Sequence, residues 1–458
     1  MLKRFDRVLI AGSGCAGMAF AKVLSRYAQE VLVVDPAVTP AAAKNPQDAH
    51  AHVLLGAGTD ALLRLFPDLE FAGMSFPRLV DPGLRLKWVT PYGPMATSAT
   101  GIRTLIGHRR QLLEAMHRSL ARTSNIRFVE GLAAEVAYDY STKRFSATIK
   151  TSAAQCSLSS DLFLDATGWQ SASVNTAVEQ GWIGLEEESF DSNIAYSSVT
   201  VVTDKKMDWD MLMANASPPK IKRSAIALKH AENTYVLTMC GLLGERTPRR
   251  NTEISAFIQG LKYPGDIIKL LDGAHVSPKV DYYRNGCNRI RRVQVKTKVP
   301  YFLVGDGIAR LSPYHGFGLS MALFQAETMQ SLLEQGFQPD PALFYSATDK
   351  ALSRLVRYVR GTELDWQAAE QLGQDHVTMR WHEDLLWKAA AKSQNHAFAN
   401  ILRGSFHLKY RPSKWNKASL SLSLALFSVK EILKKCSLQL RGIPWRKIVP
   451  KYSHEAMP

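Results

Sequence analysis

Three glycines near the start of the chain are spaced to bind a pyrophosphate. Gly12, Gly14 and Gly17 form a G-x-G-x-x-G pattern between the strand-like RVLIAG and a helix-like segment. Such glycines allow a tight turn, let a pyrophosphate approach the backbone and bring helix and strand together, while the helix N-terminus supplies N–H donors. Asp35 ends the next predicted strand, EVLVVD, where a carboxylate can bind a ribose diol. Residues 7–35 therefore predict a strand–helix–strand unit that binds a dinucleotide, although a purely packing role for the glycines stays open.

A second glycine-rich turn lies far along the chain, in VGDGIARLSPYHGFGLSMA at 304–322. Asp306 follows an apolar strand and could bind a polyol hydroxyl, and Gly316-Phe317-Gly318 opens a helix. A helix N-terminus favours negative charge, and the pyrimidine edge of a reduced flavin is negative. A nicotinamide dehydrogenase would fit the first turn equally well, but two turns suit the two ends of one FAD. The alternative is a coincidental strand–turn–helix with a capping role.

The sequence resembles the FAD-dependent monooxygenases of the para-hydroxybenzoate hydroxylase type, and more narrowly the flavin epoxidases that act on polyene intermediates in polyether biosynthesis. The segments that carry the resemblance are GSGCAG (12–17), PQDAHAHVLL (46–55), RQLLE (110–114), DLFLDATGWQSA (161–172), FDSNIAYSSVTVV (190–202) and YFLVGDGIARLSPYHGFGLSMA (301–322). They span about residues 5–335. The resemblance implies an α/β fold: a Rossmann-like FAD-binding domain with an inserted, mostly antiparallel substrate sheet and a C-terminal helical region.

The change from strand–helix alternation to β-rich sequence sets the expected domain boundaries. Residues 1–180 form the first part of the FAD-binding domain, with 70–105 expected to join the substrate lobe. Residues 181–295 form the substrate-binding sheet, 296–345 return to the FAD-binding domain, and 346–458 form helices and a basic tail. Helices are expected over 53–69 and 108–123 as well.

The resemblance also implies roles for individual residues. Gly12, Gly14 and Gly17 would hold the pyrophosphate, with Ser13, Cys15 and Ala16 beside them, and Asp35 would bind the adenosine ribose. Arg110 would contact the phosphate–ribityl region, the Ala134 backbone the adenine, and Asp165 and Gly168 the surroundings of the pyrophosphate. Gly305 and Asp306 would meet the ribityl chain, and Gly316, Phe317 and Gly318 would donate backbone N–H groups to the pyrimidine ring.

The reaction that the resemblance implies uses FAD and molecular oxygen. Reduced flavin would form a C4a-hydroperoxide that epoxidises or hydroxylates a lipophilic, electron-rich alkene or arene in secondary metabolism. Candidate catalytic residues are His50, His52 and His315, although a loop histidine is more often structural or solvated, and no metal site is expected. Trp88, Tyr196 and Tyr235 are candidate pocket aromatics or ordinary core, and Arg289, Arg291 and Arg292 read as a solvated edge.

One departure from the relatives concerns the electron donor. Where they often carry Gly-Arg in the flavin-side loop, this chain has Asp48-Ala49. A basic residue there can assist nicotinamide phosphate binding, so NAD(P)H acting directly and a separate flavin reductase both stay open as the source of electrons.

Other functions remain open too. A flavin-dependent halogenase would be expected to carry W-x-W-x-I-P, and this chain contains no W-x-W. A non-redox flavin cyclase acting on a polyene would need an acidic residue aimed at the alkene, and none is identifiable. A non-enzymatic flavin-binding protein is the third alternative.

Charge and cysteine usage bound the location of the protein. The net charge is +16, and residues 401–458 carry 12 Lys or Arg against Glu431 and Glu455. This basic tail suggests a peripheral membrane contact or merely a solvated face, and no specific nucleic-acid site. Five scattered cysteines form no C-x-x-C pair, which suits a reducing cytoplasm. The segment 418–433 is lipophilic but too short to span a bilayer.

Overall fold

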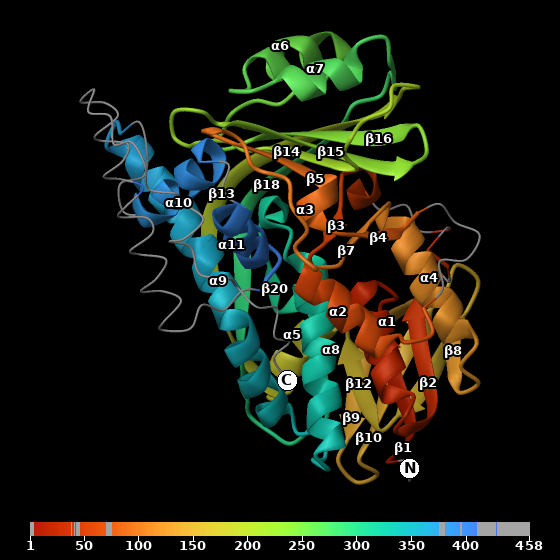
Figure 1. Cartoon of the computed structure of the whole chain (residues 1–458). Coiled ribbons are helices and arrows are strands. Elements are labelled where there is room, and N and C mark those ends of the chain that lie inside the picture. The colour runs from red at the N-terminus through yellow and green to blue at the C-terminus, as the bar shows by residue number, and fades with distance from the viewer. Residues whose placement is uncertain are drawn as a thin grey trace, which may run out of the picture.

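A computed structural model of the chain describes residues 4–37, 39–40, 42, 46–69, 76–374, 381–393, 396–409 and 427. Two sheets organise these residues. Figure 1 shows a parallel sheet around the N-terminus and a larger, mostly antiparallel sheet above it, with a long helix running along one side of both. The predicted fold class is confirmed.

The parallel sheet has the strand order β19-β12-β1-β2-β8. Its strands are β1 (Phe5–Ala11), β2 (Ala28–Asp35), β8 (Ile126–Glu130), β12 (Leu162–Asp165) and β19 (Tyr301–Leu303). Val8, Ile10, Val31 and Val33 are fully buried, as expected for strands that are covered on both faces. The chain adds β2 and β8 on one side of β1 and β12 and β19 on the other. Ligands of open α/β sheets bind where the order reverses in this way, beyond the carboxyl ends of the strands.

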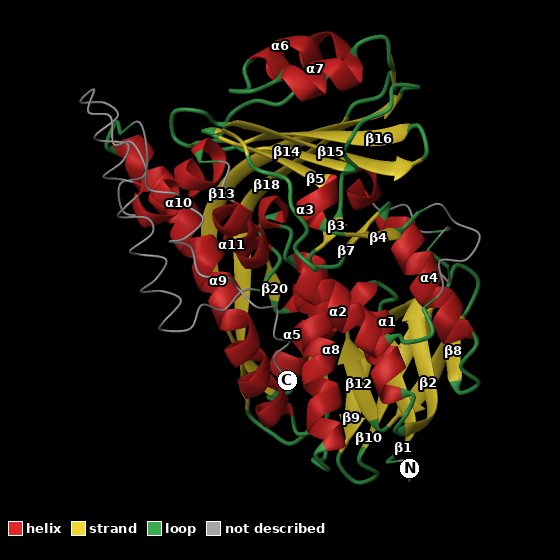
Figure 2. Cartoon of the chain, viewed as in Figure 1, coloured by secondary structure: helices red, strands yellow, loops and turns green. Residues whose placement is uncertain are grey.

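Helices and a small sheet cover the parallel sheet. The helices are α1 (Cys15–Leu24), α2 (Gly56–Leu65), α4 (Arg109–Ala121), α5 (Ala172–Glu179) and α8 (Gly318–Glu334), and the small sheet contains β9 (Leu132–Asp139), β10 (Arg144–Lys150) and β11 (Gln155–Ser160). The predicted helix at 53–69 begins only at Gly56, because Val53 and Leu54 form β3 and pair with β7 (Thr104–Ile106). Strand β4 (Arg78–Val80) completes that short sheet, which lies between the two large ones (Figure 2).

The nine-stranded sheet is built around two long neighbours, β13 (Ile183–Val202) and β18 (Asp281–Val295). Its other strands are β5 (Leu86–Thr90), β6 (Gly93–Pro94), β14 (Met211–Ala214), β15 (Arg223–Ala231), β16 (Thr234–Gly241), β17 (His275–Val276) and β20 (Ala309–Arg310). The short helix α3 (Pro82–Arg85) precedes β5, which pairs with β14 in parallel, whereas the other pairs of this sheet are antiparallel.

Alternation along the strands gives this sheet two different faces. Val199 and Val201 point to the outer face and pack with α6 (Ile254–Gln259) and α7 (Gly265–Leu271). Ile194 and Tyr196 point to the inner face, toward Tyr283 and the loop that contains Tyr314. Figure 1 shows α6 and α7 on the side of the sheet that faces away from the parallel sheet.

Three C-terminal helices join the two sheets. They are α9 (Pro341–Gln371), α10 (Trp381–Lys392) and α11 (His396–Phe406). The side chain of Asp340 caps α9 by accepting from Ala342 N–H at 2.7 Å. Phe344 packs in the core of the parallel sheet, whereas Trp366 packs beside Tyr196 at the inner face of the nine-stranded sheet. Within the described residues, no helix is long and apolar enough to cross a membrane. The basic tail beyond residue 409 and the segment 418–433 lie outside the described residues, except for Phe427.

Candidate functional site

The first glycine turn joins β1 to α1, and its three glycines have different structural roles. Gly12 has a φ of +98°, and a β-carbon there would lie 2.6 Å from the Ala166 carbonyl oxygen. A β-carbon on Gly17 would lie 1.9 Å from the Gly12 oxygen, whereas one on Gly14 would meet nothing within 4 Å. The first and third glycines are thus required by packing, and the second faces open space at the start of α1. Gly14 caps this helix without a side-chain hydrogen bond, which leaves N–H donors for an anion.

The expected adenosine end lies at the carboxyl ends of β2 and β8. Asp35 accepts hydrogen bonds from the Ser13 N–H at 2.7 Å and from the Ala37 N–H at 2.8 Å, so the carboxylate also closes the first turn. The Gly131 N–H donates to the Asp35 carbonyl at 3.1 Å. Ala134 is half-buried three residues further on, at an irregularity where β9 shifts its register against β10. The backbone near Ala134 therefore follows the carboxyl end of β8, at the same edge of the parallel sheet as Asp35.

Asp165 ends β12, next to β1, but its side chain turns into the protein. The carboxylate is fully buried and accepts from the Thr167 N–H at 2.9 Å and hydroxyl at 2.6 Å. The hydroxyls of Ser171 and Ser173 donate to its other oxygen. These partners hold the loop that follows β12. Asp165 thus supports the wall of the first turn through Ala166 rather than presenting its carboxylate to the open space.

The second turn reaches the first at Gly305. This residue has a φ of +64°, and a β-carbon there would lie 2.9 Å from the β-carbon of Ala16 in α1. A β-carbon on Gly168, which has a φ of +93°, would lie 3.9 Å from that of Asp306. Asp306 is open to solvent, yet the surrounding protein raises the pKa of its carboxyl group, opposed by Arg310 and Arg109. Exposure combined with desolvation places Asp306 in a recess between the two turns.

The helix α8 begins at the far end of this recess. Gly316 adopts the left-handed conformation with a φ of +70°, and Phe317 is buried. A β-carbon on Gly318, the first residue of α8, would meet nothing within 4 Å. Phe317 caps the helix without a side-chain hydrogen bond. The helix start therefore resembles that of α1: a glycine faces open space beside backbone N–H groups.

Two arginines at the start of α4 bind one acidic residue. Asp48, which is buried, lies 2.9 Å from Arg109 Nη1 and 3.5 Å from Arg110 Nε. Arg109 is the more enclosed of the two, and its charge partly opposes the rise in pKa that burial causes at both Asp306 and Cys15. Arg110 is the predicted contact to the phosphate–ribityl region, and of the two arginines it is Arg109 whose charge acts on Asp306. The sequence pattern places both arginines at the start of the helix and does not indicate which of them faces Asp306.

His50 and His52 lie on the loop beside the recess and are both neutral at neutral pH. Burial lowers the pKa of His52 to about 4, and burial lowers the pKa of His50, opposed by Asp281. His50 Nδ1 lies 2.8 Å from Ser198 Oγ, and its ring lies 6.2 Å from that of Tyr283. His50 thus faces the inner side of the nine-stranded sheet. Burial also raises the pKa of the Cys15 thiol to about 12, which excludes a thiolate at the first turn.

His315 belongs to a buried polar cluster that the sequence reading missed. Its Nε2 lies 3.0 Å from Glu363 Oε1, and both side chains are buried. Asn288 donates to Glu363 at 2.5 Å and accepts from the Ser312 N–H at 2.6 Å. The cluster joins α9, β18 and the second turn, and thereby fixes the loop that leads into α8. Glu363 and Asn288 had no signal in the sequence because they meet His315 only through the fold.

An aromatic cavity of about 180 Å³ lies beside His315 and Phe317. Its walls include Trp88, Tyr314, Trp366 and Trp387 from four separate elements. Trp88, which the sequence left open as a pocket aromatic or a core residue, therefore lines a cavity. Its indole N–H donates to Asn215 Oδ1 at 3.0 Å, so the ring is held in place.

The other two candidate aromatics lie on opposite faces of the nine-stranded sheet. Tyr196 is on the inner face, 6.3 Å from the ring of His50. Tyr235 packs against Trp209 in the outer core beneath α6 and α7, so its proposed pocket role is wrong and the core reading is right.

Arg291 corrects the reading of residues 289–292 as a solvated edge. Its side chain is buried, pairs with Glu187 at 2.8 Å and lies 3.9 Å from the centre of the Trp169 ring. It also donates to the carbonyl of Gly307 at 3.4 Å. Arg291 thus ties β18 to the second turn, whereas Arg289 and Arg292 are exposed.

These observations fit a large dinucleotide better than a metal. The two turns meet at Ala16 and Gly305, and each helix start presents a glycine with open space above it. In the part of the chain that the structure describes, no group of three or more His, Cys, Asp or Glu side chains could hold a metal ion.

Known proteins share this architecture at low sequence identity. No protein-family model matches the sequence. The protein Rv3254 of Mycobacterium tuberculosis (strain ATCC 25618 / H37Rv) is 24% identical over 348 residues, which cover 72% of this chain and 73% of the relative.

Three solved structures illustrate the likeness in fold. A triple mutant of the flavin-dependent brominase Bmp2 has a TM-score of 0.62 and 13% identity, covering 93% of this chain and 100% of that one. The p-nitrophenol 4-monooxygenase PnpA from Pseudomonas putida DLL-E4 has a TM-score of 0.62 and 14% identity, covering 90% and 100%. A single-site mutant of 2-methyl-3-hydroxypyridine-5-carboxylic acid oxygenase has a TM-score of 0.57 and 15% identity, covering 81% and 93%. The chain therefore has the α/β fold of the FAD-binding monooxygenases.

Proposed function

We propose that this chain is a flavin-dependent monooxygenase that transfers one oxygen atom from O₂ to a lipophilic, electron-rich alkene or aromatic substrate. The observation that carries the proposal is the meeting of the two glycine turns, with Gly14 and Gly318 each facing open space. Two helix N-termini suit the two negatively charged parts of a reduced FAD. The shared fold with flavin-dependent monooxygenases and a brominase supports flavin-dependent oxidation in general.

The chain's own residues would hold FAD in four places. The turn at Gly12–Gly17 binds the pyrophosphate, and Asp35 binds the ribose with the lone pairs that Ser13 and Ala37 leave free. Asp306 accepts from the ribityl hydroxyls, and the start of α8 donates N–H groups to the ring. Bound FAD, once reduced, supplies the activation of O₂. Arg109, held by Asp48, places one positive charge beside this path.

The substrate would lie in the aromatic cavity, next to Phe317. Its aromatic walls favour an apolar, flat or extended molecule. Neutral His50 and His52 lie on the loop beside the inner face of the nine-stranded sheet, where they act as hydrogen-bond partners and not as cations. Glu363 orients His315, so His315 is a positioning residue at the cavity wall rather than a free acid or base.

The electron donor belongs to the proposal as well. Asp48 occupies the guanidinium groups of Arg109 and Arg110, which would otherwise attract the phosphates of a nicotinamide cofactor. We therefore favour a separate flavin reductase over direct reduction by NAD(P)H.

The test begins with the visible spectrum of the purified chain. FAD bands that persist through gel filtration, and that are bleached by a flavin reductase with NADH but not by NADPH alone, are expected. Oxygen uptake that depends on adding a polyene or phenol substrate then measures turnover. A colourless chain that takes up no added FAD would overturn the proposal.

Halogenation is a second candidate because the fold is shared with a flavin-dependent brominase. Bromide in the same assay separates the two reactions. A brominated product would favour halogenation, whereas an oxygenated product that forms equally without bromide supports the monooxygenase. Isomerised product without oxygen uptake would instead identify a non-redox cyclase.

A further inference from the structure

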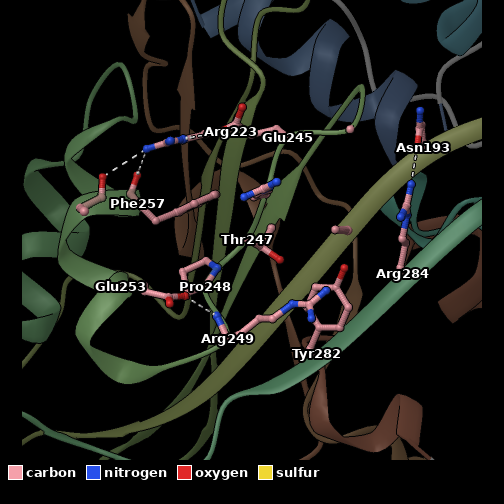
Figure 3. Close-up of a pocket in the computed structure, with 14 residues that line it drawn as sticks. Asn193, Arg223, Glu245, Thr247, Pro248, Arg249, Glu253, Phe257, Tyr282 and Arg284 are labelled. Atoms are coloured by element: carbon pink, nitrogen blue, oxygen red, sulfur yellow. Dashed lines mark hydrogen bonds and ion pairs between the residues drawn. The ribbon is translucent and has the colours of Figure 1, made fainter.

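A large pocket lies on the outer face of the nine-stranded sheet, away from the aromatic cavity. Its volume is about 850 Å³. It is lined from β13, β15, β18, α6 and the loop 244–249 (Figure 3). Ala195 and Tyr282 line it, whereas their strand neighbours Tyr196 and Tyr283 face His50 on the other side of the same sheet. The pocket is therefore separate from the proposed flavin site.

Four arginines line this pocket, but only one of them is neutralised by a carboxylate of the wall. Arg223 pairs with Glu245 at 2.8 Å and also donates to the Ala256 carbonyl at α6. The second carboxylate, Glu253, is paired with Arg250, which lies outside the pocket. Glu253 also accepts a hydrogen bond from the Arg249 N–H at 2.8 Å, so its negative charge lies beside the pocket arginines.

The three remaining arginines are Arg246, Arg249 and Arg284, and all are exposed. Among the residues that the structure describes, none of them has a carboxylate within ion-pair distance. Arg284 donates to the side-chain oxygen of Asn193 at 3.1 Å. An amide holds the guanidinium in place without cancelling its charge. The four arginines and two carboxylates that line the pocket thus leave an excess of two positive charges in a concave wall.

An aromatic ring lies beside these charges. The guanidinium of Arg249 is 4.4 Å from the centre of the Tyr282 ring, and Figure 3 shows the two side chains extending together along the floor. Tyr282 is 38% exposed, so one face of this pair is open to a ligand. Such a pair can stack on a flat ring, and guanidinium groups bind phosphate oxygens in a bidentate manner.

We propose that this pocket is a second ligand site, for a diphosphate-bearing small molecule of nucleotide size. Arg246, Arg249 and Arg284 bind the phosphates, and Tyr282 with Arg249 receives the ring of a nucleoside. A concave pocket of this volume suits a small molecule. Because the sheet separates it from the recess at Asp306, a ligand here does not contact a flavin there. The site is for binding, independent of the proposed oxidation.

Calorimetric titration of the full chain saturated with FAD tests this site. Pyrophosphate, ADP and adenosine are the three probes, because they separate the phosphates from the ring. Saturable binding is expected for ADP, weaker binding for pyrophosphate and none for adenosine. Arg249→Gln with Arg284→Gln should weaken ADP binding by about tenfold or more, since each removes a charge-assisted bond. Higher salt should weaken it further.

Two controls keep the result specific to this pocket. Arg292→Gln removes the same charge from the same strand outside the pocket, and ADP affinity should change by less than about twofold. The titration is repeated with Gly14→Val, which fills the first turn, so that ADP bound there is not counted. Failure of ADP and pyrophosphate to bind, or an equal loss in Arg292→Gln, would overturn the second site. Loss of ADP binding in Gly14→Val alone would do the same.

Discussion

The two glycine turns reach similar helix starts by different means. The first turn is shaped almost entirely by main-chain contacts: a side chain on Gly12 or Gly17 would strike backbone atoms. The second turn is shaped by buried side chains, since Glu363 and Asn288 hold His315 and Ser312 from elements 48 and 24 residues away. A backbone-shaped turn depends on residue spacing, whereas a side-chain-supported turn depends on distant partners.

The largest expected effect breaks the first turn itself. Gly17→Ala forces a β-carbon to within 1.9 Å of the Gly12 oxygen, so helix and strand must separate. We expect the free energy of unfolding to fall by about 3 kcal/mol or more. Urea denaturation followed by circular dichroism measures this. The matched control is Gly14→Ala, where the β-carbon meets nothing and the loss should stay below about 1 kcal/mol. Equal losses in both variants would contradict a backbone-shaped turn.

The next effect compares the two open glycines without disturbing the fold. Gly14→Val and Gly318→Val place bulk in the space above each helix start. FAD affinity, measured by quenching of flavin fluorescence, should weaken at least about tenfold in each, which corresponds to 1.4 kcal/mol. Gly265→Val is the control, because Gly265 also begins a helix, α7, with nothing within 4 Å. Unchanged affinity in Gly318→Val would remove the second turn from the FAD site.

A smaller effect tests the side-chain support of the second turn. Glu363→Ala leaves the buried side chains of Asn288 and His315 without their shared hydrogen-bond partner. This should lower the free energy of unfolding by about 1–3 kcal/mol. Glu363→Gln keeps an acceptor and should cost less. On the same helix, Glu370 is exposed and pairs with Lys222, so Glu370→Ala should change stability by less than about 1 kcal/mol. If Glu363→Ala behaved like Glu370→Ala, the cluster would not support the turn.

The last effect comes from outside both turns and is visible only as a dependence on pH. His407 accepts from the Gly56 N–H at 3.1 Å through Nδ1, and burial, with Arg403 adding to it, lowers its pKa to about 3. The unfolded chain binds a proton here near pH 6.5 and the folded chain does not. Stability is therefore complete above pH 6.5 and falls as the pH drops toward 3, by at most about 1.4 kcal/mol per pH unit.

His407→Asn isolates that contribution because the amide oxygen can still accept from Gly56 while the side chain cannot titrate. Free energies of unfolding at pH 7, 6 and 5 should show a shallower slope for the variant than for the parent chain. Parallel slopes would mean that His407 is protonated in the folded state.

The same contrast explains how much could be predicted from the sequence. The strand–helix–strand unit at 7–35 and the start of α8 follow from local pattern and spacing, because their constraints lie within a few residues. The fold class as a whole followed from the family resemblance. Glu363 and Asn288 could not be predicted, since α9 and β18 bring them to His315 only after folding.

The face of the sheet on which a strand residue lies could not be predicted from the sequence either. Tyr235 and Tyr196 lie in similar apolar strands, but the sheet is covered on both sides, so alternation alone does not say which face meets the cavity. Arg291 was misread for a related reason: a run of arginines looks solvated, yet the middle one stacks on Trp169. Which of Arg109 and Arg110 faces Asp306 depends on the first turn of α4, which spacing does not determine.

The parallel sheet is completed only by β19 at Tyr301–Leu303, whose neighbour in the sheet, β12, ends at Asp165. During synthesis the ribosome must therefore make the whole intervening sheet before the first domain can close. Pairing of this kind has a large sequence separation and is slow to form. Until then the edge of β12 lacks its neighbouring strand, and an uncovered edge of this kind favours aggregation during folding.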